Sequence, residues 1–355
     1  MHDFARYSST TTISSAMIMA AGLGTRLRPF TYDTPKPLLP LLGVPMLQFA
    51  MDALSWSGMP IRRLVMNHSH LSKELRVGAE QLSYGKMELS LSDESDLLLG
   101  GAGGLRKALP TLGLSSPFFV MNADVLCALD LAALADTHFR LRAAYGTTLT
   151  MAIHRKSPGK GAYRTIHTEP TFQCGSNSGL IRRLGTPLQA TPFYSGVAVI
   201  EPEAISHLPE GRELEFVPEI LERAITAGTA GAHLFEGEWM DIGSPELWLD
   251  AHLDLIKKLE TGQLPELWRK RIELASVRTA EGVWEARSNQ VWSGAPPVMT
   301  PSAYFQGSHL DAKAWLQIGP NAVVYGSPPP GQSSITHGIT WHGRSWTRPT
   351  SAGAS

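Results

Sequence analysis

The sequence predicts an α/β fold in which a mostly parallel sheet carries helices on both faces, followed by a small C-terminal β domain. Over the first half of the chain, apolar runs of strand length alternate with segments whose apolar residues recur at helical spacing. A helix between two strands returns the chain to the same edge of the sheet, so neighbouring strands run parallel. From Gln263 onward, Pro, Gly, Trp and Ser become more frequent and short strand-like runs follow one another, which indicates separate β structure.

The elements of the α/β part follow from their local patterns. A buried strand is predicted where apolar residues form a short run, and a helix where they return every three or four positions. At the last helix, Ser244 supplies a hydroxyl cap and Pro245 occupies the first turn. The predicted strands are 16–21, 61–66, 87–91, 118–121, 148–153 and 197–200, and the predicted helices are 45–57, 71–82, 131–141, 214–226 and 245–259.

The predicted organisation has two folded parts and two tails. Residues 14–262 form the α/β domain and residues 263–346 the C-terminal β domain, while residues 1–13 and 347–355 are expected to be disordered. Translation could start naturally near Met17, which begins the first apolar strand. A signal peptide cleaved near Ala20 would remove that strand, which argues against one.

Composition indicates an ordinary globular protein of the cytoplasm. The chain of 355 residues has a formal net charge of −1 and an apolar content of 43%, so nothing draws it as a whole toward nucleic acid or acidic membranes. No apolar run reaches the length that spans a bilayer. Cys127 and Cys174 have neither zinc-ligand spacing nor partners for a disulfide framework, which fits a reducing compartment.

The loop after the first strand carries the strongest functional signal. Gly22 and Gly24 let the backbone turn sharply and approach a ligand, and the N–H groups of such a turn suit phosphate oxygens. Arg26 adds a planar, permanent charge. Further along, Lys36 stands between two prolines that limit its backbone freedom, so its ammonium group is held as a point charge.

Two common phosphate-binding motifs are excluded at this loop. The dinucleotide fingerprint requires a third glycine where Leu27 stands, and the Walker A pattern requires a Gly-Lys-Ser or Gly-Lys-Thr run that does not follow Gly22. From composition alone, the alternative is a glycine-containing turn with surface charges that bind nothing.

The stretch from Gly22 to Pro45, GLGTRLRPFTYDTPKPLLPLLGVP, resembles the signature of sugar-1-phosphate nucleotidyltransferases. Its Gly-x-Gly-Thr-Arg and Pro-Lys-Pro elements have the separation found in that family, and the resemblance extends over residues 14–259. It implies a Rossmann-like, GT-A-like nucleotidyltransferase fold. It also implies that Arg26 and Lys36 are catalytic, and that the nucleotide is bound by Ala21, Gly22, Leu23, Gly24, Thr25 and Arg26.

A second glycine-rich segment, 99–105, has four glycines in five residues, and we do not expect it inside a helix or strand. A flat backbone surface for a planar base is the functional interpretation, and a flexible linker is the alternative. The segment resembles the family's Leu-Gly-Thr-Ala-Gly, which reads the base and lines the sugar pocket, with Gly101 in place of Thr. The resemblance implies that Gly103 contacts the nucleotide and Gly104 the sugar.

Two carboxylates are expected to hold a divalent cation. Asp124 follows the strand 118–121, and α/β sheets bind ligands beyond the carboxyl ends of their strands. A carboxylate there can hold a hard cation that bridges phosphates, whereas a helix N-cap is the alternative role. By resemblance, Asp124 matches the magnesium-binding Asp of the family's Asn-Gly-Asp, with Ala123 in place of Gly. Asp241, in the run WMDIGSP, matches the second magnesium ligand.

The sugar side departs from the family pattern. The run FYSG resembles the segment where family members place a sugar-contacting turn, in the version of N-acetylmuramic acid-1-phosphate uridylyltransferases and related mannose-1-phosphate guanylyltransferases, and it implies Ser195 and Gly196. The Glu-Lys-Pro triplet whose lysine holds the sugar phosphate in many members is absent. Arg182, Arg183 or Lys160 could replace that lysine, and the sequence does not choose among them.

The C-terminal part has short strand-like runs at a loose six-residue beat. Residues 316–324, LQIGPNAVV, resemble one coil of the left-handed parallel β-helix that several of these enzymes carry. Stacked coils of that kind bury a core that one coil cannot bury alone.

The resemblance implies a reaction in which an NTP and a sugar-1-phosphate give a nucleotide sugar and pyrophosphate, with Mg²⁺ as cofactor. Guanylyl transfer to mannose-1-phosphate is the expected version. Uridylyl or thymidylyl transfer to another sugar-1-phosphate, such as that of N-acetylmuramic acid or glucose, is the alternative. A non-catalytic sugar-nucleotide-binding regulatory subunit is an alternative of another class, which the presence of Arg26, Lys36, Asp124 and Asp241 disfavours. A homo-oligomer is expected.

Overall fold

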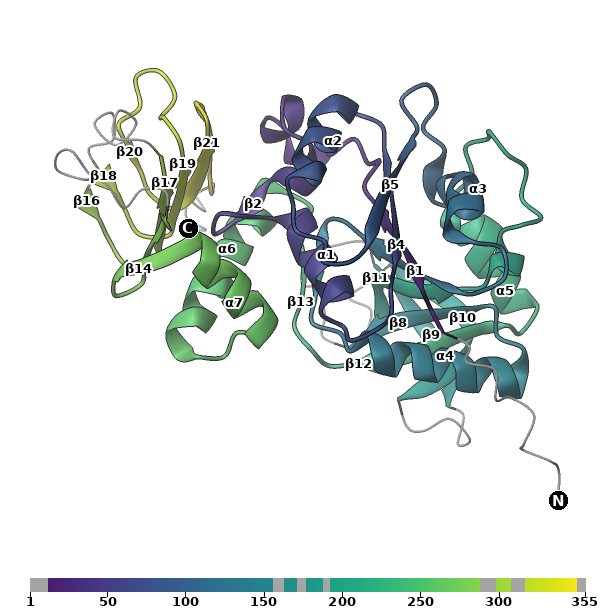
Figure 1. Cartoon of the computed structure of the whole chain (residues 1–355). Helices are drawn as coiled ribbons and strands as arrows, with labels where there is room; N and C mark the ends of the chain where they lie inside the picture. Colours follow the sequence, from purple (N-terminus) through teal and green to yellow (C-terminus); the bar gives the residue numbers. More distant parts are fainter. Residues whose placement is uncertain are drawn as a thin grey trace. The chain divides into compact units, whose positions relative to one another are not determined.

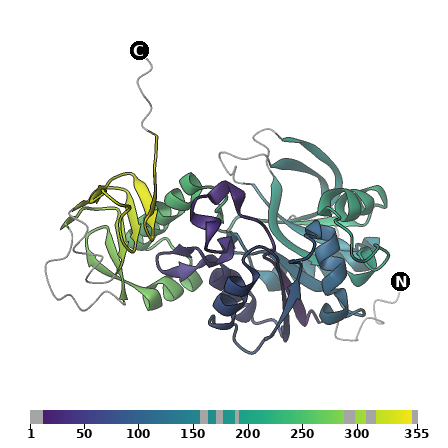
Figure 2. The same ribbon diagram turned by 90° about the horizontal axis from the view of Figure 1, so that it is seen from above.

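The computed structural model describes residues 12–155, 163–170, 177–187, 192–287, 298–307 and 317–349. The chain divides into two compact units, which Figures 1 and 2 show from two directions. The first unit consists of Met1–Gly22 and Ala50–Trp239, and the second of Leu23–Phe49 and Met240–Ser355. The predicted boundary at residue 262 therefore does not coincide with the division, because two earlier segments belong with the C-terminal part.

The first unit contains a nine-stranded sheet in the order β5-β4-β1-β6-β11-β8-β12-β10-β9. One half is parallel, as predicted, because β1 pairs in parallel with both β4 and β6, and β4 with β5. The bounds are β1 Ser15–Met19, β4 Arg63–His68, β5 Glu88–Asp93, β6 Phe118–Asn122, β8 Leu149–His154, β9 Arg164–Pro170, β10 Ser178–Pro187, β11 Phe193–Ile200 and β12 Ala230–Phe235. A short strand, β7 Val125–Cys127, follows β6.

The prediction of a mostly parallel sheet is wrong for the other half. Strand β11 is antiparallel to both β6 and β8, and β10 is antiparallel to β9 and β12. Between β8 and β11 the described residues form β9 and β10 and no helix. Strand β8 still pairs in parallel with β12, so this half combines one parallel pair with antiparallel ones and the complete sheet is mixed.

Helices cover both faces of the parallel half, as predicted. Figure 1 shows α2 Ser72–Glu80 and α3 Gly100–Leu112 on opposite sides of β4 and β5. Helix α4 Leu131–Tyr145 packs on β8, β11 and β12. The predicted helix 214–226 is a π-helical turn, Val217–Leu221, that continues into α5 Glu222–Thr226. The core between these layers is aliphatic and aromatic and includes Met17, Val65, Phe118, Leu149 and Ile200.

The glycine-rich segment 99–105 is helical, which corrects the expectation that it lies outside regular structure. Helix α3 begins at Gly100, whose φ of +69° suits glycine, and continues through Gly103 and Gly104. A Cβ on Gly103 would lie 2.4 Å from the carbonyl oxygen of Arg212. The glycines therefore permit close packing of a helix, and the cost in helix propensity is offset by that contact.

The same close packing explains why Gly101 replaces the family's Thr. A Cβ at this position would lie 2.9 Å from the Cβ of Phe216. A branched side chain would collide with that residue, so in this chain the position is adapted to the packing of the segment before α5.

The second unit combines helices, short turns and β structure. It contains 3₁₀ turns at Thr25–Leu27, Phe30–Tyr32 and Lys36–Leu38, the two-residue strands β2 Pro40–Leu41 and β3 Val44–Pro45, and the helices α6 Pro245–Thr261 and α7 Glu266–Ala275. Strand β13 Trp239–Asp241 spans the boundary between the units, and α1 Met46–Ser55 begins in this one. The Ser244 hydroxyl accepts a hydrogen bond from the Leu247 N–H at 3.3 Å, so the predicted cap of α6 is confirmed.

Successive strands from β15 to β21 in the C-terminal β part belong alternately to two parallel sheets. Strands β15, β17, β19 and β21 pair in parallel in one sheet, and β16, β18 and β20 in the other, with β14 and β22 antiparallel at the edges of the first. Phe305, Ile318, Val324 and Ile335 lie in a shared core. The left-handed β-helix itself stays a prediction. The bounds are β14 Ser276–Ala280, β15 Val283–Ala286, β16 Val298–Met299, β17 Ala303–Gln306, β18 Gln317–Ile318, β19 Ala322–Tyr325, β20 Ser334–Ile335, β21 Gly338–Trp341 and β22 Arg344–Thr347.

Two boundaries of the predicted tails differ from the structure. Ile13 is fully buried, and Thr347 belongs to β22, where it pairs with Gly338. The remainder of both predicted tails lies largely outside the described residues. Within the part of the chain that the structure describes, no helix is both long and apolar enough to cross a membrane.

Buried aromatic side chains explain why Leu23–Phe49 belongs with the C-terminal part. The Trp248 indole of α6 donates a hydrogen bond to the carbonyl oxygen of Pro40 at 2.8 Å. Trp248 and Tyr325 stack with their ring centroids 6.1 Å apart, and both are buried. Helix α6 thus connects the N-terminal segment and the β strands through one packed centre.

His252 completes this centre as a neutral ring. Its Nδ1–H donates to the Trp248 carbonyl oxygen at 2.8 Å, so Nε2 accepts from the Tyr325 hydroxyl at 2.7 Å. Burial lowers the pKa of His252 to about 4, because the charged ring would lose its hydration.

This burial predicts an acid-sensitive second unit. In the unfolded chain His252 takes up a proton near pH 6.5, but the folded protein does so only near pH 4, so stability is complete above pH 6.5 and is lost as the pH falls toward 4. Between pH 7 and pH 5 this linkage costs about 2 kcal/mol. We expect urea unfolding of the His252→Gln variant to lack that loss, since glutamine keeps a donor and an acceptor but does not titrate. Equal pH dependence in both proteins would contradict this.

Candidate active site

In the first unit, the end of β1 is held between two neighbouring strands. The Ala20 N–H, just after β1, donates to the Asn67 side-chain oxygen at 2.7 Å, and the Ala123 N–H donates to the Met19 carbonyl oxygen at 3.1 Å. The turn that contains Asp124 therefore lies beside the start of the glycine loop. This is the carboxyl edge of the parallel strands, where α/β sheets bind their ligands.

Asp124 does not have the alternative role of a helix cap. Helix α4 is capped by Asp130, whose carboxylate accepts from the Ala133 N–H at 3.0 Å. Asp124 is partly buried in the turn between β6 and β7. Its position is therefore explained by this edge of the sheet and not by α4.

A buried polar chain continues from the same edge to α3. The Asn67 amide donates to Glu94 Oε1 at 2.8 Å, and Glu94 Oε2 accepts from the Leu99 N–H at 3.0 Å. Asn67 and Glu94 are 2% and 1% exposed. We did not single out Glu94 from the sequence, because it stands in a polar run without periodicity and its partners are distant along the chain.

Gly103 and Gly104 lie inside α3, and their faces are covered. A Cβ on Gly104 would lie 2.7 Å from Glu94 Oε1, and the corresponding atom on Gly103 would meet the Arg212 carbonyl. Both residues are buried. The structure thus accounts for these glycines by packing, and their contacts with nucleotide and sugar stay predictions.

Ser195 and Gly196 lie in β11 and not in a separate turn. The pairing of β11 with β8 is irregular between Tyr194 and Ala198, and Gly196 has a φ of +89°. A Cβ on Gly196 would lie 3.1 Å from the Asn122 amide nitrogen, so this bulge lies next to the turn of Asp124. The Ser195 hydroxyl donates to the Ala152 carbonyl oxygen at 2.9 Å.

Aromatic side chains surround this bulge. The Trp239 indole donates to the Ser195 carbonyl oxygen at 2.9 Å, and its ring contacts those of Phe193, His154 and Tyr163 at centroid distances of 4.8, 6.3 and 5.7 Å. Trp239 lies in the predicted motif, but its neighbours come from distant parts of the chain, so no local pattern could have shown the cluster.

In the second unit, the loop and the lysine are brought together. Gly24 has a φ of +62°, and its carbonyl oxygen accepts from the Thr31 hydroxyl at 2.8 Å and from the Leu27 N–H at 3.0 Å. A Cβ on Gly24 would lie 3.2 Å from the Cβ of Lys36. The stem of Lys36 therefore packs directly on the loop.

Arg26 lies against the backbone that follows Asp241. A Cβ on Gly243 would be 3.1 Å from both terminal nitrogens of the Arg26 guanidinium. Arg26 is exposed, as is Leu23, whereas Ala21 is buried and the space beside Gly22 is open. The second unit thus groups Gly24, Arg26, Lys36 and the Asp241–Gly243 segment.

Comparison with known proteins shows the family of the chain. The family model described as nucleotidyl transferase matches residues 15–258. The chain belongs to the nucleotidyl transferase family.

The names of the relatives specify different nucleotide bases and different sugars. The chain is 28% identical over 270 residues to a UTP–glucose-1-phosphate uridylyltransferase of Synechocystis, covering 70% of this chain and 66% of that protein. It is 30% identical over 265 residues to the catalytic subunit beta of a mannose-1-phosphate guanylyltransferase of Drosophila melanogaster, covering 71% and 66%. It is 28% identical over 230 residues to an N-acetylmuramate alpha-1-phosphate uridylyltransferase of Neisseria meningitidis, covering 64% and 93%. The chain thus spans less than two thirds of the length of the first two relatives.

Two solved structures share the fold. HddC from Yersinia pseudotuberculosis matches with a TM-score of 0.56 at 21% identity, over 68% of this chain and 100% of that one. A UDP-glucose pyrophosphorylase in complex with UDP-glucose matches with a TM-score of 0.56 at 20% identity, over 70% and 100%. The α/β nucleotidyltransferase fold is therefore shown.

Asp124 and Asp241 are the carboxylates predicted to hold a magnesium ion. Among the described residues, no three His, Cys, Asp or Glu side chains are grouped to hold a metal ion. Mg²⁺ is usually held by one or two carboxylates together with water and substrate phosphates. The oxygen donors of Asp124 and Asp241 suit that hard cation.

The replacement for the family's missing lysine is only partly covered by the structure. Arg182 in β10 pairs with Glu169, with Nε 2.6 Å from the carboxylate, and Arg183 is exposed on the same strand. Lys160 lies outside the described residues. All three stay candidates for the sugar phosphate.

No cysteine nucleophile serves the described part of the site. Cys127 is buried beside Ser195, and burial raises the pKa of its thiol, so the reactive thiolate is disfavoured. Cys174 lies outside the described residues.

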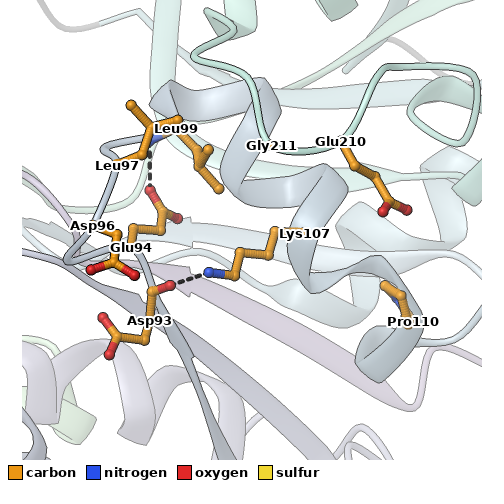
Figure 3. A pocket seen from close by; sticks show the side chains of 9 residues that line it. All are labelled: Asp93, Glu94, Asp96, Leu97, Leu99, Lys107, Pro110, Glu210 and Gly211. Carbon is orange, nitrogen blue, oxygen red and sulfur yellow. Dashed lines mark hydrogen bonds between the residues drawn. The ribbon is translucent and has the colours of Figure 1, made fainter.

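A cavity of about 450 Å³ lies on the first unit near the start of α3. Figure 3 shows the carboxylates of Asp93, Asp96 and Glu210 around it, with Glu94 bound to the Leu99 N–H and Lys107 bound to the Asp93 carbonyl oxygen. The exposed part of its lining carries three carboxylates and one ammonium group, that of Lys107, and this net negative charge disfavours a triphosphate.

Substitution of single glycines tests whether they are needed for packing or for contact with a ligand. We expect Gly103→Ala to lower the unfolding free energy by about 1–3 kcal/mol, since its Cβ meets a backbone carbonyl. Gly22→Ala should change stability by no more than about 0.5 kcal/mol, because nothing lies within 4 Å of that Cβ. Urea unfolding of both variants measures the difference. A stable Gly103→Ala protein would refute the packing explanation.

Proposed function

We propose that this protein transfers a nucleoside monophosphate from an NTP to a sugar-1-phosphate. An oxygen of the sugar phosphate bonds to the α-phosphorus, the bond from that phosphorus to the bridging oxygen of the β-phosphate breaks, and pyrophosphate leaves. The observation that supports this most is the packing of Lys36 against Gly24 in a member of the nucleotidyl transferase family.

The chain's own residues supply position and charge. The loop amides and Arg26 would bind the triphosphate and the departing pyrophosphate. Lys36, with its stem held against Gly24, would stabilise negative charge that grows at the α-phosphate during transfer. Such a reaction needs in-line positioning and charge compensation, and no side chain has to form a covalent bond.

Magnesium is part of the proposal. Asp124 and Asp241 would hold Mg²⁺, which withdraws negative charge from the substrate phosphates when bound. Both residues stand at positions that match the family motif, and Asp124 lies in a turn beside the end of β1.

For the substrate pair we propose GTP and mannose-1-phosphate. The 30% identity to a mannose-1-phosphate guanylyltransferase supports this version. Uridylyl or thymidylyl transfer to glucose-1-phosphate or N-acetylmuramic acid-1-phosphate is the alternative, and the uridylyltransferases among the relatives favour its uridylyl form. A cytoplasmic location and a homo-oligomer stay predictions.

A measurement of pyrophosphate release tests the proposed function. The purified protein would be incubated with Mg²⁺, each NTP and each of the three sugar-1-phosphates, with omission of the sugar phosphate as the control. Turnover that requires both substrates is expected. Nucleotide-sugar binding without release of pyrophosphate from any pair would instead identify the non-catalytic regulatory subunit.

The metal assignment is tested at the two carboxylates. We expect Asp124→Asn and Asp241→Asn each to lower kcat at least about a hundredfold, because each loses a charge that would hold Mg²⁺. Their thermal stability should change little, since the side-chain volume is kept. Asp130→Asn is the matched control, because asparagine also caps a helix, and it should keep activity. Near-normal turnover in either site variant would remove that residue from the site.

The two cations should separate in steady-state kinetics. Lys36→Ala should lower kcat by about a hundredfold to a thousandfold with a modest change in KM for the triphosphate, because its charge acts mainly in the transition state. Arg26→Ala should raise that KM at least as much as it lowers kcat, since Arg26 contacts groups present before and after reaction. Lys36→Arg should rescue poorly, because the guanidinium is wider. An unchanged kcat with a raised KM in Lys36→Ala would exclude this role.

A further inference from the structure

The segment that carries Lys36 has little regular structure of its own. Its backbone forms one 3₁₀ turn, with hydrogen bonds from the Leu38 N–H to the Pro35 carbonyl oxygen at 2.9 Å and from the Leu39 N–H to the Lys36 carbonyl oxygen at 3.1 Å. A single turn of this kind is a weak restraint, so contacts from other elements must keep the lysine in place.

C-terminal residues contact this segment just before the lysine. The Trp341 indole donates to the Thr34 hydroxyl at 3.2 Å, and the Arg344 guanidinium forms an ion pair with the Asp33 carboxylate. Arg344 also lies over the ring of Tyr32, 5.8 Å from its centroid. These partners are separated by about three hundred residues along the chain, so the contacts exist only in the folded protein.

The contacting side chains form a row across adjacent strands. Tyr325 of β19 is in register with Trp341 of β21, and Trp341 is in register with Arg344 of β22. The rings of Tyr325 and Trp341 are 5.2 Å apart, and Trp248 of α6 packs on both. The row is therefore supported by buried aromatic packing.

After the lysine, the same packing holds the chain again. Trp248 donates to the Pro40 carbonyl oxygen at 2.8 Å. The Tyr325 hydroxyl is 3.4 Å from that oxygen, but its proton is used in the 2.7 Å bond to neutral His252, so Tyr325 acts here by packing. The segment is thus held on both sides of Lys36.

We propose that the C-terminal β strands position Lys36, with Trp341 and Arg344 as the positioning residues. This inference rests on the proposed function for its effect on turnover. Arg26 provides the contrast, since its guanidinium lies against Gly243 and, among the described residues, no hydrogen bond or ion pair joins it to β21 or β22. The C-terminal strands should therefore influence the lysine and leave the arginine unaffected.

Trp341→Phe removes the indole donor and keeps an aromatic ring. A lysine displaced by a fraction of an ångström should lower kcat roughly fivefold to tenfold while KM for the triphosphate changes less than twofold. Thr34→Val removes the acceptor of the same bond and should have the same effect. Arg344→Ala should act in the same direction.

Two matched variants control for general damage to the domain. Trp284→Phe removes an indole donor bonded to Glu260 at 2.9 Å, and Arg348→Ala removes an ion pair with Asp250. Neither partner belongs to the lysine segment. Both controls should keep the wild-type kcat, and a loss equal to that of Trp341→Phe would overturn the proposal.

A double-mutant cycle separates positioning from a structural role. In a Lys36→Ala background, Trp341→Phe should lower kcat no further, because there is no lysine to misplace. In an Arg26→Ala background, the full fivefold to tenfold loss should remain. Equal losses in both backgrounds would contradict action through Lys36.

Hydrogen exchange of residues 33–41 tests the contact without any turnover. Trp341→Phe and Thr34→Val should speed exchange of the Leu38 and Leu39 amides, and Trp284→Phe should not. Unchanged exchange overturns the proposal whatever the activity, and faster exchange with unchanged kcat overturns the positioning role. If the wild-type protein turns over no substrate pair but exchange rises as described, the proposed function fails while the support of this segment by the C-terminal strands stands.

Discussion

The structure around the signature depends on one close contact, that of Lys36 with the backbone of Gly24. Gly24 has a left-handed φ, and a side chain there would press on both Thr31 and Lys36. Its carbonyl oxygen accepts two hydrogen bonds, which close the loop on itself. Any larger residue would separate the lysine from the loop, so the absence of a Cβ at one position allows a flexible cation to be held near a candidate phosphate site.

The contact between Lys36 and Gly24 is supported by two further sets of contacts in the second unit. The segment 33–40 rests on Trp248 of α6, and α6 in turn packs on Tyr325 of the C-terminal strands. The second unit therefore combines the family signature from Leu23 onward with the segment that contains Asp241 and with the β strands that follow. A boundary drawn where the composition changes, at residue 262, separates parts that one aromatic core joins.

In the first unit, close packing likewise depends on glycines, here those of α3. Its glycines stand where the helix approaches Arg212, Phe216 and Glu94 so closely that a Cβ would collide. Glu94 and Asn67 then connect α3 to the residue after β1 through buried hydrogen bonds. Buried polar groups of this kind are costly unless each is paired, so the chain from Ala20 to Leu99 fixes the relative placement of three strand ends.

Much of the fold was accessible from the sequence. Strand-length apolar runs and helical spacing predicted β1, β4, β5, β6, α2 and α4, because local burial patterns decide such elements. The sequence singled out Gly24 and Lys36 by their motif, and only the structure shows that the two residues pack together. Tertiary structure alone decided the antiparallel half of the sheet, the helical state of the glycine-rich segment and the partners of Glu94 and Trp341. Each depends on residues far apart in the chain, whose approach no local pattern contains.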